Sequence, residues 1–403
     1  MTGIGNSTFS SCTNLVNITI PDSVTGIGNS AFAFCSNLVS INIPDGVISI
    51  GNSAFTYSGL VSITIPAGVT GIGNSAFSCC FSLVSISVST GNSVYSSTEG
   101  VLYNKDKTTL LAYPIGKKDN TFSIPDSVTK IKDFAFYRCT NLTGINIPDS
   151  VTDIENSAFR SSGLTGSITI PDGVTGIGGD AFSGCNSLTS VTIPDSVTGN
   201  IGNLAFYNCT NLVSVTIGNG ITGIGDRAFS NNKSLAGVTI GNGVTGIGSH
   251  AFSECPSLVS IALPDGLTGI EGATFYGCSS LTSVTIGNGV TRIGTNAFTM
   301  CTSLVGITIP DSVISIGYRA FYECSSLTGI IIPSSVTGIG WSAFYNCNSL
   351  ISVTFNGTIP SSAFDTSQPF PGNLRAEFYT YDRVNGTPGT YTRPGGGNSW
   401  TRE

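Results

Sequence analysis

Residues 258–280 read LVSIALPDGLTGIEGATFYGCSS, and close copies of this 23-residue unit follow one another along most of the chain. One phenylalanine per copy marks the period, at Phe9, Phe32, Phe55, Phe77, Phe136, Phe159, Phe182, Phe206, Phe229, Phe252, Phe275, Phe298, Phe321 and Phe344, with a shortened last copy at Phe364. A unit of this length cannot enclose an apolar core alone, so neighbouring units must stack on each other. The sequence therefore predicts a repeat solenoid of about 14 to 15 units over residues 1–364.

Each unit contains the pattern of a strand, a turn and a return path. In the copy at 258–280, Leu258, Ile261 and Leu263 alternate with small residues, which indicates a strand that stacks into a parallel sheet. Pro264-Asp265-Gly266 favours a turn. Glycine and serine are too frequent in the return path for a long helix, so we expect a short extended segment and one helical or 3-10 turn that carries the phenylalanine inward.

These residues resemble the BspA-like branch of the leucine-rich repeat family, whose units read L-x-x-I-x-I-P-x-x-V-x-x-I-G-x-x-A-F-x-x-C. The resemblance implies a right-handed superhelix with a parallel β-sheet on its concave side, and short extended segments with single helical or 3-10 turns on its convex side. It also implies a bacterial protein without enzymatic activity that binds host, matrix or cell-surface proteins. Thr390-Tyr391-Thr392-Arg393-Pro394 resembles the ending of spirochaete members of the branch.

Two segments depart from the period. Phe77 and Phe136 are 59 residues apart, which is one unit plus 36, and the sequence between them predicts a β-hairpin insertion near 89–121. From residue 365 onward the pattern is lost. We expect residues 365–403 to form a β-rich cap, with extended segments at 374–381 and 390–401.

The composition argues against several classes of partner. The formal net charge is −7, only 10% of the residues are charged, and the basic residues are scattered singly. We therefore expect neither nucleic acid nor a membrane surface as a partner. The first residues have no basic and apolar signal pattern, and no run of eighteen apolar residues occurs, so no membrane insertion is expected. A cell-surface or secreted location follows only from the resemblance, and a cytoplasmic one stays open.

The first unit starts in its middle, because Thr2-Gly3-Ile4-Gly5 copies Thr25-Gly26-Ile27-Gly28. Solenoids need covered ends. A trimmed chain, a covering domain and contact with another molecule are all compatible with this start. The last of these predicts an alternative function, a building block that assembles into filaments or surface layers through its N-terminal rung.

The reactive residues favour structural roles. Eleven of the twelve cysteines stand three residues after a phenylalanine, and we expect them to be free buried thiols, with inter-rung disulfides left open. Asp126, Asp149, Asp172 and Asp195 occupy one turn position, where capping is favoured over calcium. The single histidine, His250, lies in a polar surface position. We predict no catalytic residue, no metal and no cofactor.

The candidate protein-binding residues are aromatic. The outward positions of the predicted sheet carry serine and threonine, which favours a weaker alternative of ice or ordered-water binding, whereas binding hot spots are usually Trp, Tyr or Arg. Aromatic residues instead gather beside the phenylalanines of the last full units. We predict a protein-binding patch of Tyr318, Arg319, Tyr322, Trp341, Tyr345 and Tyr276. An alternative is that these tyrosines merely shield the turn.

Overall fold

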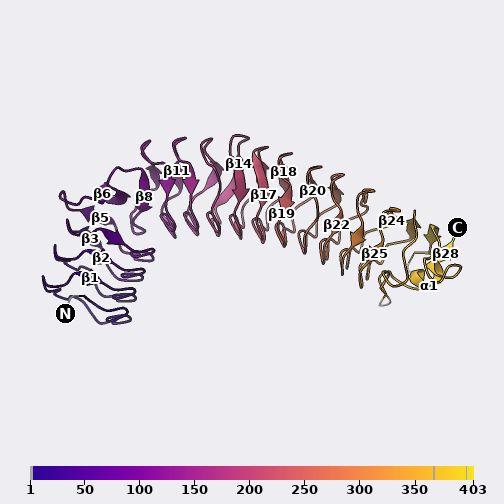
Figure 1. The fold of residues 1–403 in the computed structure, drawn as a ribbon, viewed down its shortest axis with the longest axis horizontal. Coiled ribbons are helices and arrows are strands. Elements are labelled where there is room, and N and C mark those ends of the chain that lie inside the picture. The colour runs from indigo at the N-terminus through magenta and orange to yellow at the C-terminus, as the bar shows by residue number, and fades with distance from the viewer. Residues whose placement is uncertain (1–2, 366–367, 396) are drawn as a thin grey trace. The chain divides into compact units, whose positions relative to one another are not determined.

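A computed structural model describes residues 3–365, 368–395 and 397–403. The chain forms two compact units of stacked rungs, where one rung is one folded repeat (Figure 1). The first unit contains Met1–Thr165 and Gly173–Asn186, and the second contains Gly166–Asp172 and Ser187–Glu403. Most rungs contain a strand of a first sheet, a strand of a second sheet and a series of turns around the phenylalanine.

In the first unit, the first sheet arises from the Leu-x-x-Ile-x-Ile pattern and pairs its strands in parallel. These are β3 (Ser62–Ile65) with β5 (Ser85–Val88), and β9 (Thr121–Ser123) with β11 (Gly144–Asn146). The second sheet arises from the Thr-x-Ile pattern and has two separate parts in this unit. One part contains β1 (Gly26–Ile27), β2 (Ser49–Ile50) and β4 (Gly71–Ile72). The other contains β10 (Lys130–Ile131) and β12 (Asp153–Ile154), joined by the insertion strands β6 (Tyr95–Thr98), β7 (Val101–Asn104) and β8 (Thr109–Ala112).

The second unit repeats the same arrangement. Its first-sheet strands are β13 (Gly166–Thr169), β14 (Leu188–Ile193), β16 (Ser214–Ile217), β18 (Gly237–Ile240), β20 (Ser260–Ala262), β21 (Ser283–Thr285), β24 (Gly329–Ile332) and β26 (Ser352–Phe355). Its second-sheet strands are β15 (Gly199–Ile201), β17 (Ile221–Ile224), β19 (Gly246–Ile247), β22 (Arg292–Ile293), β23 (Ser315–Ile316) and β25 (Gly338–Ile339). These strands pair in parallel, so the predicted parallel-strand solenoid is confirmed.

The core is a column of stacked phenylalanine rings. Phe32 and Phe55 lie 5.5 Å apart between ring centroids with only 3° between their planes. Both rings are fully buried. Stacked aromatic pairs contribute about 0.5–1.5 kcal/mol beyond the burial of their surface. The 23-residue period places equal residues on top of each other, so each regular rung adds one such pair.

The turns around each phenylalanine are closed by single hydrogen bonds of the 3-10 type, as predicted, and in the described residues they do not continue into a 3-10 helix. Ala33 N and Cys35 N do donate to the carbonyls three residues earlier, those of Ser30 and Phe32. However, Ser30 and Phe34 have positive φ values of 52° and 61°, which end a helical path at once. The amides between these bonds donate to the next rung instead, as Phe32 N does to Ala54 O at 2.7 Å. The turns therefore join the rungs as well as close them.

The cysteines donate hydrogen bonds along the column. Cys301 Sγ lies 3.2 Å from the carbonyl oxygen of Phe275, one rung earlier, and seven further cysteines make the same contact with their own preceding phenylalanine: Cys35, Cys80, Cys185, Cys255, Cys278, Cys324 and Cys347. All twelve thiols are free and eleven are buried. In another rung Asn232 occupies the cysteine position, and its Nδ2 donates to Phe206 O at 3.0 Å. The position therefore requires a donor that satisfies a buried carbonyl.

The insertion is larger than the predicted hairpin. Strands β6, β7 and β8 form an antiparallel meander, and β8 then pairs in parallel with β10. Immediately after β8, Tyr113 takes the place of a column phenylalanine. Its ring centroid lies 5.2 Å from that of Phe136, and its amide donates to Ala135 O at 2.8 Å. Tyr113 therefore marks a rung between Phe77 and Phe136 that the phenylalanine period does not predict.

The C-terminal segment also differs from the prediction in detail. Residues 374–381, expected to be extended, begin with the helix α1 (Leu374–Phe378). The strands β27 (Gly389–Thr392) and β28 (Thr401–Arg402) extend the first sheet beyond β26 in an antiparallel manner. The column ends on Phe370, which stacks on Phe344 at 4.5 Å. Phe364, which we took for the last column residue, instead bridges Ile339 at the second sheet.

Candidate binding surfaces

The predicted patch contains an arginine surrounded by aromatic rings. The guanidinium carbon of Arg319 lies 5.0 Å from the ring centroid of Tyr318, 4.9 Å from that of Tyr322 and 5.2 Å from that of Trp341. Tyr322 stacks on Tyr345 at 5.7 Å, and Tyr318 lies 4.9 Å from Trp341. We call these five residues the Arg319 cluster. Cation–π contacts at such distances are worth about 0.5–2 kcal/mol each.

Local backbone geometry assembles the cluster. Tyr318 and Arg319 precede Phe321 by three and two residues, and Tyr322 follows it directly. Trp341 and Tyr345 hold the corresponding positions around Phe344, so the register places Trp341 beside Tyr318 and Tyr345 beside Tyr322. Arg319 itself has a left-handed backbone, with φ of 50°. Two rungs thus present one continuous aromatic surface.

The cluster is half-buried and holds an unsatisfied donor. Trp341 keeps 39% of its surface exposed. The Nε of Arg319 is buried and has no hydrogen-bond partner among the described residues. Loss of water contact raises the pKa of the Tyr322 hydroxyl, and a hydrogen bond with Glu323 raises it further. The hydroxyl therefore stays protonated at neutral pH and can donate a hydrogen bond.

Tyr276 lies apart from the cluster. It holds the same position in its rung as Tyr322, but Thr299 occupies that position in the rung between them. In the described part of the chain, no ring contact joins Tyr276 to the five residues of the cluster. The structure therefore brings together five of the six predicted residues.

A second exposed surface, in the first unit, was not predicted. Phe34 and Tyr57 stack at 5.0 Å, and Tyr57 contacts Phe81 edge-on at 5.9 Å. Phe34 and Phe81 are 48% and 53% exposed. Four valines that directly follow the first leucine of successive units are also exposed: Val16, Val39, Val61 and Val84. Part of the signal was present in the sequence, since Phe34 and Tyr57 replace small polar residues two positions after a column phenylalanine.

The serine and threonine rows of the sheet face solvent, whereas Asp195 at the turn has a hydrogen-bond partner. In β16, Ser214 and Thr216 face solvent while Val215 and Ile217 are buried. At the turn, Asp195 Oδ1 accepts a hydrogen bond from the Asn219 amide of the next rung at 2.7 Å. The described residues include no group of three or more His, Cys, Asp or Glu that is arranged to hold a metal ion.

His250 is a partly buried surface residue. Burial lowers the pKa of its imidazole, and the nearby charge of Arg227 lowers it further, against an opposing effect of Asp226. The ring is therefore neutral at physiological pH.

The family model of the BspA type leucine rich repeat region, with six copies, matches residues 2–119, 116–235, 154–278 and 268–369. The chain belongs to this family. The resemblance derived from the repeat pattern is thereby confirmed. Members of this repeat family generally act as interaction or surface scaffolds without catalytic activity. No curated protein sequence matches the chain.

Solved structures of bacterial leucine-rich repeat proteins are similar to this BspA-type chain. One from Bacteroides ovatus is 30% identical, with a TM-score of 0.57, and the match covers 88% of this chain and 81% of that one. One from Eubacterium ventriosum is 27% identical, with a TM-score of 0.58 and 80% of each chain covered. A leucine rich cell surface protein from Faecalibacterium prausnitzii is 30% identical, with a TM-score of 0.36, and the match covers 76% of this chain and 62% of that one.

In the described residues of this BspA-type protein, the helices are too short to span a lipid bilayer.

Proposed function

We propose that this protein is a non-catalytic scaffold that binds a protein partner through the Arg319 cluster. The single observation that carries this proposal is the guanidinium held against three rings, with Nε buried and unsatisfied. Arginine and aromatic residues dominate binding hot spots because they combine apolar area with directed hydrogen bonds. A complementary partner surface presents a carboxylate framed by apolar side chains.

The proposed partner is a host, matrix or cell-surface protein, and the proposed location is the cell surface or the medium. Membership of a repeat family that generally serves as an interaction scaffold supports a protein partner. The resemblance to BspA-like surface proteins supports the proposed location. The low charge density of the chain gives little reason to expect nucleic acid.

The proposal is tested by surface plasmon resonance with a panel of purified matrix and cell-surface proteins. We expect at least one of them to bind the full chain, and we expect Arg319→Ala and Trp341→Ala to weaken that binding by about tenfold or more. Tyr207→Ala is the matched control for Tyr322→Ala, because Tyr207 also follows a column phenylalanine directly. Equal losses in Tyr322→Ala and Tyr207→Ala would contradict the assignment of the site.

Self-association is the second candidate function, and the exposed column of Val16, Val39, Val61 and Val84 favours it. Contiguous exposed apolar surface commonly marks an interface. Light scattering across a dilution series measures it directly. A particle mass that grows with concentration, and that Val39→Lys with Val61→Lys abolishes, is the expected result. A mass independent of dilution would exclude self-association.

Ice binding by the Ser/Thr rows is a weaker alternative. An unchanged shape of ice crystals grown with the purified protein would exclude it.

A further inference from the structure

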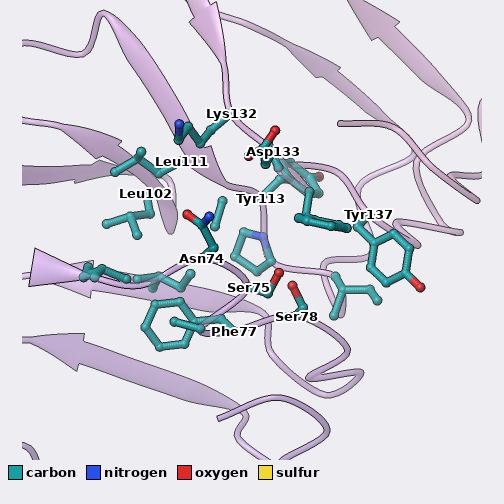
Figure 2. A pocket seen from close by; sticks show the side chains of 18 of the residues that line it. Asn74, Ser75, Phe77, Ser78, Leu102, Leu111, Tyr113, Lys132, Asp133 and Tyr137 are labelled. Carbon is teal, nitrogen blue, oxygen red and sulfur yellow. The ribbon is translucent and has the colours of Figure 1, made fainter. Parts of the chain in front are cut away.

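The ring column of the first unit is interrupted once, between Phe77 and Tyr113. Phe77 stacks on Phe55 at 5.9 Å, and Tyr113 stacks on Phe136 at 5.2 Å. Phe77 and Tyr113 make no ring contact with each other in the described part of the unit. A cavity of about 100 Å³ lies at this interruption (Figure 2).

The insertion creates this gap. In ordinary rungs the residues before the phenylalanine form turns that match the rung beside them. Before Tyr113, however, the chain is the strand β8, which pairs with β7 and β10. Because β8 is extended, it does not present the carbonyls of a turn to the rung of Phe77. The rung of Phe77 therefore packs beside an extended strand instead of the matching turn that other rungs have on this side.

Three backbone amides lose their acceptors as a result. In the rung before, the amides of Ser53, Phe55 and Tyr57 donate to Asn74 O, Ala76 O and Ser78 O at 2.9, 2.9 and 3.2 Å. Their counterparts one rung later are the amides of Ser75, Phe77 and Cys79. None of the three has a hydrogen-bond acceptor among the described residues, although Phe77 and Cys79 are only 7% and 5% exposed.

Ser75, Phe77 and Cys79, the residues that carry these amides, all line the cavity. The rung register directs each of them toward the next rung, and the next rung at this point is the other wall of the cavity. Buried amides without a partner are rare in folded proteins, since each costs about 1–3 kcal/mol. The row therefore calls for an acceptor that the chain itself does not supply.

Polar side chains at the same place are also without partners. Asn52 Oδ1 accepts from the Asn74 amide at 2.8 Å, as Asn29 Oδ1 does from the Asn52 amide one rung earlier. This column of amide side chains ends at Asn74, which is exposed to solvent and whose own side chain has no protein partner among the described residues. Figure 2 shows Asn74, Ser75 and Ser78 beside the opening.

Most of the remaining lining is apolar, and its two charged side chains already have partners. Leu102 and Leu111 lie on one side of the opening in Figure 2, and Leu83, Ile86 and Ile115 are also part of the apolar lining. Lys132 Nζ lies 2.9 Å from Glu155 Oε2. Asp133 Oδ1 accepts from the Asn156 amide at 2.9 Å. The cavity thus combines hydrogen-bond donors with an apolar wall.

We propose that this cavity, the gap site, binds a small molecule that carries a carbonyl or carboxylate oxygen on an apolar body of about one ring. The oxygen accepts hydrogen bonds from the amides of Phe77 and Cys79, as the carbonyl of a regular rung would. The body packs on Leu102 and Leu111 and fills the missing place in the ring column. The gap site of about 100 Å³ is smaller than the closed cavity of roughly 150 Å³ that holds one benzene ring, but it is open on one side, so part of the bound molecule extends out of the opening.

Titration calorimetry of the full chain with benzoate, benzamide and toluene tests the proposal. Benzoate or benzamide binds at least about tenfold more tightly than toluene, since one net hydrogen bond is worth about that factor. The comparison of benzoate with benzamide distinguishes an anionic from a neutral acceptor. Equal affinity for all three, or binding of none, overturns the proposal.

Hydrogen exchange provides a readout that depends on the amides themselves. In the free protein the amides of Ser75, Phe77 and Cys79 exchange faster than those of Ser53, Phe55 and Tyr57. Bound benzoate or benzamide slows the first set and leaves the second unchanged. Binding without any such slowing would place the molecule elsewhere and overturn the assignment.

A cavity-filling variant completes the test. Ala112→Leu places a larger side chain in the lining and reduces the affinity by about tenfold or more. Ala236→Leu is the matched control, because Val213 and Val259 already occupy the same position in the neighbouring rungs. Equal affinity of the two variants would contradict the site. The exchange measurement on the unmodified chain remains decisive if Ala112→Leu does not fold.

Discussion

At the scale of single residues, the fold depends on a few positions whose chemistry is repeated in register. The column phenylalanine supplies apolar area, and the cysteine three residues later supplies a weak donor to the carbonyl of the preceding phenylalanine. Gly51 shows a third constraint. A Cβ there would lie 2.6 Å from the Asn29 amide nitrogen of the preceding rung, so this position requires glycine.

Removal of one column ring should be costly. Phe252 is fully buried between Phe229 and Phe275, at 5.5 and 5.8 Å. We expect Phe252→Ala to lower the free energy of unfolding by about 3–5 kcal/mol, measured by urea denaturation. Phe34→Ala is the control, because this ring is 48% exposed. A loss in Phe34→Ala as large as that in Phe252→Ala would contradict the role of the column.

The buried thiols predict a loss of stability in alkali. Burial raises the pKa of the Cys185 thiol from 9.0 to about 11 and that of Cys347 to about 12. The unfolded state therefore loses these protons at a lower pH than the folded state. The stability that the buried neutral thiols contribute is complete below pH 9 and is lost as the pH rises toward 11 to 12. The urea midpoint should fall across this range. In the double variant Cys185→Ala, Cys347→Ala, the urea midpoint should fall less steeply with pH. An unchanged dependence on pH would argue against the buried thiols as its cause.

At the scale of elements, the sequence predicted the rung well and its exceptions poorly. Alternation of Leu258, Ile261 and Leu263 was enough to predict the parallel sheet, because burial on one face imposes that pattern. The left-handed residues such as Arg319 were not predictable, since side chains of many types occupy that position at a modest energetic cost. The members of the Arg319 cluster were predictable from composition, but their contacts depend on the register of two rungs.

Tyr113 shows why the insertion was misinterpreted. The predicted period is defined by phenylalanine alone, whereas the column requires only an aromatic ring at the correct distance from the next one. Tyr113 lies 23 residues before Phe136, so the period itself contained the signal. The gap site was not predictable in this way, because it follows from amides that have lost their acceptors, and these leave no pattern in the side chains.

Replacement of Tyr113 separates the ring from its hydroxyl. The hydroxyl is buried and has no partner among the described residues, and burial raises its pKa. Tyr113→Phe should therefore be neutral or stabilise the protein by about 1 kcal/mol, whereas Tyr113→Ala should cost about 3–5 kcal/mol. Thermal denaturation measures both. A large loss in Tyr113→Phe would mean that the hydroxyl has a partner that stabilises the fold.

At the scale of the whole molecule, stability in a repeat array is a sum of contacts between neighbours, so a change at one end should act locally. The C-terminal cover of the second unit illustrates this. Arg393 Nε donates to Leu350 O at 2.6 Å, and Nη2 donates to Cys347 O at 3.2 Å. The guanidinium also lies 5.1 Å from the Trp400 ring. It thereby satisfies carbonyls of the last full rung.

Arg393→Ala should open the end of the second unit. Charged hydrogen bonds of this kind are worth about 1.5–3 kcal/mol each. We expect faster hydrogen exchange in β26 and around Phe344, and unchanged exchange in β1 to β12 of the first unit. Arg383→Ala, at an arginine of the same segment, is the control. Faster exchange throughout both units would show that the chain unfolds as one cooperative block.

The insertion that precedes Tyr113 also affects how the repeat units reach the correct register during folding. A run of nearly identical units offers many wrong partnerships, since a displacement by one whole unit keeps every apolar residue inward. The β6 to β8 meander occurs at one place, and its last strand must join β10. The meander therefore fixes which unit pairs with which at this point of the array. Without it, the units on either side would be interchangeable during folding.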